Sequence, residues 1–323
     1  MSSRVESIVR DRRGGAAVII VAVLAIAAIA FAIYWFAIRG GGGGGATEKL
    51  ALQRIPASAQ VVGGLDVQEF LKSDFLKSAA KQRGVSVEQL VAQLGEKGVD
   101  VSKIASLAFG AQIGEAGPKS VVALADGSFD AQQLSQALGA AQGALMGAGA
   151  GEVASPLEHV QVVDGHLVLA GSGALYDEAV ALAGGNGKSI ADDAAIADLR
   201  SKVDTGATFW VSGVVPDAVK GQFKAVARMA SGLGVPTHFA LSGDVGSGVA
   251  VRIALRFDND VEKAVSQIQG MLSFAKAAAS GPEGEVLDSL SLDAAGQVLV
   301  AKLTIPDALI QKMASQAEQS PPL

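Results

Sequence analysis

Apolar and polar residues follow two regular periods along this chain. In residues 249–257, Val, Val, Ile, Leu and Phe occupy the odd positions, while Arg252 and Arg256 share the even positions with two alanines. This period of two is typical of a strand with one buried face. In residues 261–275, apolar residues instead recur every three or four positions, which is the period of a helix. The pattern predicts a strand followed by an amphipathic helix.

Three blocks of this kind occur twice after residue 46. The matching pairs are 57–71 with 205–219, 119–138 with 249–268, and 157–183 with 287–314. The first pair is separated by 148 positions and the other two by about 130. The first half therefore carries an insertion of about 20 residues, which residues 84–103 fit as an extra helix.

Each half reads as β-α-β-β-α-β-β-α. Its first six elements follow the order of a ferredoxin-like module. We therefore expect an α+β fold with two tandem ferredoxin-like modules (βαββαβ plus an extra β-α), in residues 47–203 and 204–316. Residues 317–323 are expected to form a disordered tail.

The predicted strand at 249–257 has a second, polar face. Arg252 and Arg256 point away from the apolar residues in this pattern. Such a face either packs on the sister module or is open, and an open face can bind a partner or can simply be solvated. The two arginines are the candidate partner-facing residues.

Residues 16–38 form a run of 23 residues without a charge. As a helix this run would be about 34 Å long, which is enough to cross the hydrocarbon core of a bilayer. Tyr34 and Trp35 lie near one end, where amphipathic rings favour the membrane interface. The sequence predicts an N-terminal transmembrane helix, with an interface marked by Arg12, Arg13, Tyr34, Trp35 and Arg39.

The charges around this run predict its orientation. Arginines cluster in the short basic tail at 1–15, and only Arg39 follows the run closely. The positive-inside rule then places the N-terminus in the cytoplasm. A glycine-rich tether at 39–46 would connect a single-pass anchor in a bacterial inner membrane to an ectodomain in the periplasm or outside. A long cleaved signal, cut near Ala28 and Ala30, is the alternative.

Composition narrows the possible partners and cofactors. The formal net charge is −6; residues 1–45 carry five arginines against two acidic residues, or +3, so the remainder carries −9. An acidic ectodomain argues against nucleic acid as a partner. The chain has no cysteine, which excludes disulfides, thiolate metal sites and thiol nucleophiles.

Two glycine-rich segments and two acidic residues resemble functional motifs only superficially. Residues 184–189 (GGNGKS) lack the first glycine of a phosphate-binding loop and follow a predicted helix, so they are interpreted as a helix C-cap and turn. Residues 147–151 (GAGAG) are interpreted as a linker. Asp192 and Asp193 are interpreted as helix N-terminal residues.

The histidines give no metal site in this interpretation. A hairpin with its turn at 164–165 would pair Val163 with His166 and place His159 about 13 Å from His166 along one polar face. Ligands of one metal ion cannot be so far apart. We therefore predict no catalytic, metal-binding or cofactor-binding residue.

The order of these features resembles a loose group of uncharacterised single-span bacterial envelope proteins. The resemblance is carried by "IPASAQVVGGLDVQEFLKSDFL" and by the "FD" before a helix, after a basic tail and one span. It implies no activity and no functional residue. We expect a non-catalytic, membrane-anchored binding or accessory protein with an envelope protein partner. A small-ligand carrier or sensor, with its ligand between the two modules, and an envelope hydrolase are the alternatives.

Overall fold

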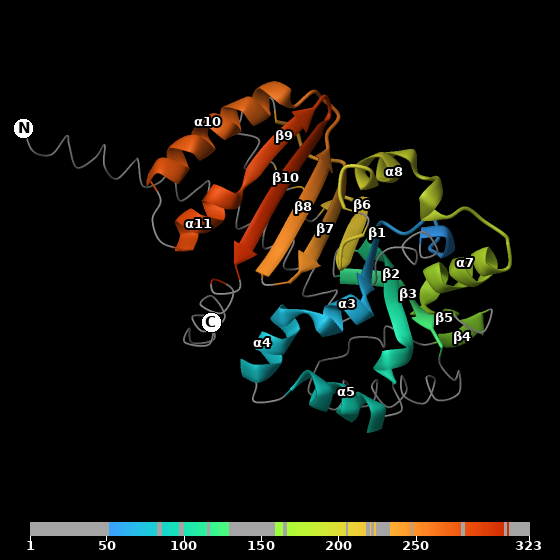
Figure 1. Cartoon of the computed structure of the whole chain (residues 1–323). Helices are drawn as coiled ribbons and strands as arrows, with labels where there is room; N and C mark the ends of the chain where they lie inside the picture. The colour runs from blue at the N-terminus through green and yellow to red at the C-terminus, as the bar shows by residue number, and fades with distance from the viewer. Residues whose placement is uncertain are drawn as a thin grey trace, which may run out of the picture.

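Ten strands form one antiparallel sheet in the part of the chain that the computed structural model describes (Figure 1). The described residues are 52–82, 86–96, 100–114, 117–128, 159–163, 167–204, 206–217, 233–246, 248–278 and 282–306, together with Lys220, Phe223 and Leu309. The strands are β1 (Val61–Asp66), β2 (Ile104–Gly114), β3 (Gly117–Gly127), β4 (His159–Val163), β5 (Leu167–Ser172), β6 (Phe209–Val214), β7 (His238–Val245), β8 (Gly248–Arg256), β9 (Ser291–Ala295) and β10 (Val298–Pro306).

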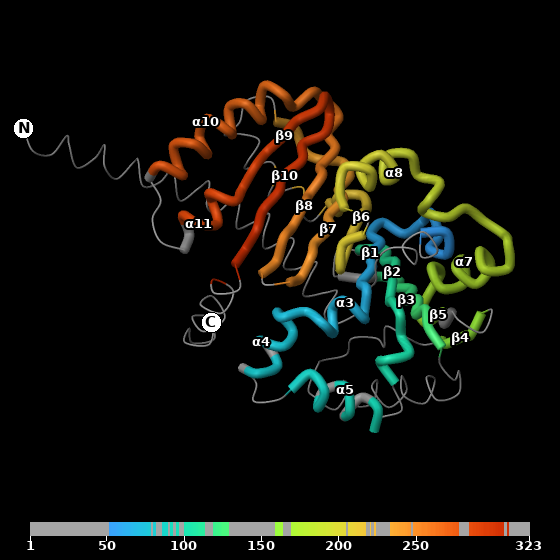
Figure 2. The backbone as a smooth tube through the Cα atoms, viewed as in Figure 1, coloured from blue at the N-terminus to red at the C-terminus, as the bar shows by residue number. Residues whose placement is uncertain are grey.

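The sheet has the same strand order on either side of its centre. The full order is β4-β5-β3-β2-β1-β6-β7-β8-β10-β9. Outward from the centre, one half runs β1-β2-β3-β5-β4 and the other runs β6-β7-β8-β10-β9. In each half the fifth strand therefore lies between the third and the fourth. Strands β1 and β6 are far apart in sequence but lie side by side at the middle of the sheet, where the tube can be followed in Figure 2.

The central pair joins the halves symmetrically. Val61 pairs with Gly213, and Leu65 pairs with Phe209. Phe209 lies 148 positions after Val61, and Gly213 lies 148 positions after Leu65. Each strand therefore occupies the same place relative to its partner, as two copies of one strand would.

Helices cover both faces of the sheet. One face is covered by α7 (Gly173–Ala183) and α8 (Ala194–Arg200), and we call it the α7/α8 face. The other is covered at the second half by α10 (Glu262–Ala278) and α11 (Pro282–Ser289), and we call it the α10/α11 face. Further helices are α3 (Val67–Lys72), α4 (Asp74–Gln82) and α5 (Val87–Glu96), with 3₁₀ turns at η1 (Val101–Lys103) and η2 (Ile190–Asp192).

The core on the α7/α8 face lies mainly over the first half. Leu175, Tyr176 and Ala179 of α7 pack against strand residues that include Val122 and Leu169. Leu199 of α8 packs in a separate cluster over the second half, with Val203, Ala240, Ala254 and Val298. Burial of these side chains is the main force that holds the two helices on the sheet.

The core on the α10/α11 face lies mainly over the second half. Ala264 and Val265 of α10 are buried against strand residues that include Phe239, Leu255 and Leu299. Helices α3 and α4 lie on this same face, because Val67 and Phe75 each belong to a cluster against which Leu65 also packs. The strand predicted for 249–257 is confirmed as β8, with Leu255 in the cluster under α10. Its other face is not polar throughout, because Ala254 is buried there with Leu199 of α8.

Glycines near the centre of the sheet make room for aromatic rings. A Cβ atom on Gly63 would lie 2.5 Å from the Phe109 ring, and one on Gly243 would lie 2.2 Å from the Phe209 ring. Trp210 pairs with Gly64 on the other face. A side chain at Gly63 or Gly243 would displace the ring, so glycine is required inside these two strands despite its low strand preference.

The predicted ferredoxin-like modules are wrong. A split βαβ module brings strands into parallel contact through a helical crossover, whereas every pair of neighbouring strands here is antiparallel. The helices after β1 do not carry the chain over the sheet. Instead β2 returns directly alongside β1, and β3 continues the meander. The linear order of elements was compatible with both arrangements.

The predicted transmembrane helix has no counterpart among the described residues. None of the helices in the described ranges is long and apolar enough to cross a membrane. Residues 16–38, the basic tail, the tether and the interface residues Arg12, Arg13, Tyr34, Trp35 and Arg39 all lie outside the described residues. The expected tail at 317–323 lies outside them as well.

Candidate partner-binding face

The outer strands of the second half present a polar surface on the α7/α8 face. Arg252 of β8 lies between Ser242 of β7 and Lys302 of β10 in the strand register. Arg252 is partly buried, and the side chain of Lys302 is 50% exposed. The neighbouring residues on this side of the strands are also exposed: Ala250, Ser291, Asp293 and Thr304.

The equivalent surface of the first half is apolar and covered. Val122 of β3 lies between Gly110 and Gly171, as Arg252 lies between Ser242 and Lys302. Val122 is 0% exposed and packs in the cluster that contains α7. A Cβ atom on Gly171 would lie 2.3 Å from the backbone oxygen of Val121 and 3.3 Å from the Tyr176 ring. The valine and glycine that receive α7 are therefore replaced by arginine and lysine in the second half.

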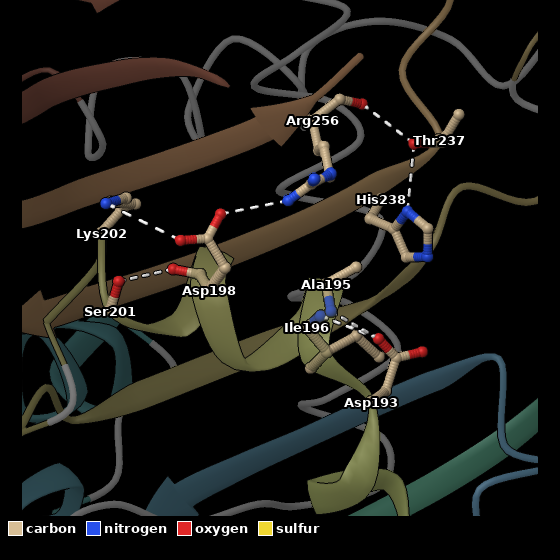
Figure 3. Close-up of polar contacts among 9 residues, drawn as sticks. All are labelled: Asp193, Ala195, Ile196, Asp198, Ser201, Lys202, Thr237, His238 and Arg256. Atoms are coloured by element: carbon tan, nitrogen blue, oxygen red, sulfur yellow. Dashed lines mark hydrogen bonds and ion pairs between the residues drawn. The ribbon is translucent and has the colours of Figure 1, made fainter. Parts of the chain in front are cut away.

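Arg256, the second candidate arginine, is held by α8. Its Nη1 lies 3.1 Å from Oδ2 of Asp198, and both side chains are partly exposed. Lys202 lies 3.8 Å from the other oxygen of Asp198. Figure 3 shows Asp198 between the two cations. These two ion pairs link α8 to the end of β8, and their exposure limits them to a modest contribution to stability.

His238 adds a polar group beside Arg256. The hydroxyl of Thr237 donates to the backbone oxygen of Arg256 at 3.3 Å, and its oxygen lies 3.0 Å from Nδ1 of His238 (Figure 3). Which of the two groups donates in the contact between Thr237 and His238 depends on the tautomer of the imidazole ring. The sequence assigned no role to this histidine.

Asp192 and Asp193 both cap helices, as predicted. Asp193 accepts hydrogen bonds from the backbone N–H groups of Ala195 and Ile196 at 2.8 and 3.1 Å, at the start of α8 (Figure 3). Asp192 accepts from the backbone N–H of Ser189 at 2.9 Å in a capping box. The two carboxylates therefore serve different turns and form no shared site.

The glycine-rich segment after α7 is a helix end, as predicted. The helix stops at Ala183, Gly184 caps it, and Gly185 and Gly187 have φ values of 84° and 114°. These values lie in the left-handed region that glycine adopts readily. The second glycine-rich segment, 147–151, lies outside the described residues.

The predicted register of the hairpin at 159–172 is wrong by one residue. Val163 pairs with Leu167, so His159 pairs with Gly171 and Gln161 pairs with Leu169. A shift of one residue turns a strand over. His159 consequently lies on the α7/α8 side, where its ring centre is 5.2 Å from that of Tyr176. His166 lies outside the described residues.

Two buried groups lie under the helices of the α7/α8 face. Arg200 at the end of α8 is 4% exposed, and its guanidinium carbon lies 4.7 Å from the centre of the Trp210 ring. This cation–π contact is enclosed and belongs to the core. Burial raises the pKa of Tyr176 above its usual value of 10.0, and Asp177 adds to this shift.

The described residues include no group of three or more His, Asp and Glu side chains that could hold a metal ion. Comparisons with protein-family models, with curated proteins and with solved structures found no match. The resemblance to single-span envelope proteins therefore stays a prediction.

The sequence singled out Arg252 and Arg256 but missed Lys302 and Asp198. Lys302 could have been found by comparing the two halves position by position, because Lys302 falls where the first half has Gly171. Asp198 had no such signal. Its contact with Arg256 depends on where α8 lies on the sheet.

Proposed function

We propose that this protein is a non-catalytic binding or accessory protein of the bacterial envelope, held at the membrane by its N-terminal apolar run. Its partner is proposed to be another envelope protein, which contacts the α7/α8 face of the second half. The observation that carries the proposal is the exchange of Val122 and Gly171 for Arg252 and Lys302 at equivalent places in the sheet. One surface is built to receive a helix of its own chain, and the other is left charged and accessible.

The charges on this face suit a polar, reversible contact. Arg256 and Lys302 each have an acidic neighbour, Asp198 at 3.1 Å and Asp293 at 3.8 Å. No carboxylate among the described residues forms an ion pair with Arg252. Such a mixed surface favours a partner that offers both hydrogen-bond acceptors and a carboxylate opposite Arg252, and it steers association more than it adds affinity.

The seam between the halves favours this proposal over a ligand carrier. Val62, Trp210 and Val211 lie on the two strands that form the seam, and each is at most 2% exposed. A ligand between the halves would have to displace these core side chains. A partner on the exposed face of β8 and β10 requires no such rearrangement.

Crosslinking in cells tests the proposed face. A photoreactive amino acid would replace Ala250 or Lys302, which share this face, or Lys263, which is exposed on α10. We expect one protein adduct from positions 250 and 302 and none from 263. Adding Arg252→Glu should reduce the adduct at 250 about tenfold, since like charges would then face each other. Lys103→Glu, which reverses an exposed charge in the first half, is the matched control and should leave the adduct unchanged.

The same adduct at all three positions, or no adduct at 250 and 302, would contradict the proposed face. The envelope location has a separate test. A reporter that is active only in the periplasm should be active when it is fused after Leu323. An inactive reporter on a stable fusion would overturn the proposed location.

A further inference from the structure

The two edges of the ten-strand sheet differ in how they are protected. Strand β9 forms one edge, where Gln269 of α10 donates to the backbone oxygen of Leu292 at 2.6 Å. Asp293, in the middle of β9, is 66% exposed. A charge in the middle of an edge strand and a side chain on its backbone both discourage pairing with another strand.

Strand β4 forms the other edge, and neither protection is found on it among the residues that the structure describes. Its five residues, HVQVV, include no Asp, Glu, Lys or Arg. Within the part of the chain that the structure describes, the hydrogen bonds of β4 come from β5 alone. Three of its residues are valines, which favour strand pairing. An uncharged edge strand of this kind is a template for a further strand.

We infer that β4 pairs antiparallel with β4 of a second copy of this chain, so that the protein dimerises and its sheet continues through the dimer. The twofold axis passes beside Gln161. In this register Gln161 lies opposite Gln161 of the second copy, Val160 opposite Val162, and His159 opposite Val163. Each valine pair adds a favourable cross-strand contact, and two facing glutamine amides can exchange hydrogen bonds.

Charge explains why this edge pairs with itself and the other does not. The same arrangement at β9, centred on the third residue of Ser291–Ala295, would bring Asp293 of one chain opposite Asp293 of the other. Like charges directly opposite each other destabilise a strand pair. The central pair β1–β6 already joins equivalent strands in an antiparallel, symmetric way. The inferred dimer repeats that arrangement between chains and is independent of the proposed function.

A single introduced cysteine tests the register directly, because the chain has no cysteine of its own. Residues directly opposite in antiparallel strands have Cα atoms about 4.5–5.5 Å apart, which is within the range of a disulfide. The full chain carrying Gln161→Cys, purified in mild detergent, should form a disulfide-linked dimer under gentle oxidation. Asp293→Cys, the control on the opposite edge, should give at least about tenfold less dimer, since nothing holds those positions together.

A second variant tests the equilibrium without a crosslink. Gln161→Lys would place two lysines opposite each other and should weaken the dimer several-fold, about fivefold or more. Asn186→Lys, exposed beyond the end of α7, is the matched control and should leave the dimer unchanged. The protein mass in detergent, measured by light scattering over a concentration series, gives the dissociation constant of the dimer for the unsubstituted chain and for each variant.

Three results would overturn the inference. The first is an equal yield of dimer from Gln161→Cys and Asp293→Cys, and the second is a dimer that Gln161→Lys does not weaken. The third is a disulfide between the introduced cysteine of the Gln161→Cys variant and a different protein. Strand β4 would then pair with a strand of that protein and not with a second copy.

Discussion

Covered and open surfaces occupy equivalent places on the α7/α8 face of the two halves. In the first half Val122 and Gly171 lie under α7, and the Tyr176 ring is 3.3 Å from the position of a Cβ atom on Gly171. In the second half Arg252 and Lys302 hold the same register positions on strands of the same order. One backbone arrangement therefore supports two surfaces. The side chains at two positions decide which surface can receive an apolar helix.

The two halves of the sheet are stabilised by different means. Over the first half the α7/α8 face is held by buried apolar area. Over the second half, the apolar core lies mainly on the opposite face, under α10 and α11. The outer part of the α7/α8 face of the second half is therefore not needed to hold a helix, and Lys302 remains exposed there.

Exchanging the residue types at Val122 and Arg252, which hold equivalent positions, should give the largest difference in the free energy of unfolding. Val122→Arg would bury an uncompensated charge under α7 and should lower the free energy of unfolding by about 3–5 kcal/mol. Arg252→Val, the matched change in the second half, should alter it by less than about 0.5 kcal/mol, as is usual for surface positions. Urea denaturation followed by tryptophan fluorescence measures both, and similar losses for the two variants would refute the contrast.

The second pair of equivalent positions should show the same contrast on a smaller scale. Gly171→Ala would force a Cβ atom toward the backbone oxygen of Val121, 2.3 Å away, and should destabilise the fold by about 1–3 kcal/mol. Lys302→Ala removes an exposed side chain and should cost less than about 0.5 kcal/mol. The urea midpoints of the two variants provide the comparison. A stable Gly171→Ala protein would show that the backbone of β3 and the Tyr176 ring can both move away from this position.

Removing Asp198 should weaken the attachment of α8 to the second half. Asp198→Ala breaks the contacts with Arg256 and Lys202, which are partly exposed, and should cost about 0.5–1 kcal/mol. The loss should shrink in 1 M salt, because screening already weakens these pairs. Lys202→Ala, which leaves the closer pair intact, is the control and should cost less. A loss that is independent of salt would contradict the electrostatic explanation.

The smallest expected effect is a pH dependence of the free energy of unfolding, which arises from Tyr176 in the first half. Burial raises the pKa of Tyr176, so above pH 10 the unfolded chain loses its phenolic proton while the folded chain still retains it. The folded state then binds more protons, and the free energy of unfolding falls as pH rises from about 10 toward the higher pKa of the folded state. Tyr176→Phe should flatten this fall. An unchanged slope in that variant would assign the dependence to other groups.

Local patterns predicted the elements of this fold better than their arrangement. The alternation in 249–257 and the helical period after it correspond to β8 and α10, and the extra helix expected within 84–103 corresponds to α5. The sheet order was not predictable from these patterns, because α3, α4 and α5 could lead either to a parallel crossover or to an antiparallel neighbour. The short hairpin at 159–172 was misaligned by one residue because its loop is longer than the two-residue turn suggested by Asp164 and Gly165.

The sequence predicted some residues of the candidate face but not their neighbours. The period of two showed that Arg252 and Arg256 share a side of their strand, which the register confirms. It could not show that Asp198 reaches Arg256, because that contact joins residues 58 positions apart through the placement of α8. Nor could it show that Lys302 lies beside Arg252, since this depends on the pairing of β8 with β10.

The symmetric seam between β1 and β6 has a consequence for how the molecule assembles. Its register is that of a homodimer interface, yet both strands belong to one covalent chain. Linking the two halves replaces a bimolecular encounter with an intramolecular one, at a local concentration set by the connecting chain. Closure of the seam is therefore independent of how much protein the cell contains. Because the halves are parts of one chain, they need not carry the same side chains, so one can pack under α7 while the second has Arg252 and Lys302 at the equivalent positions.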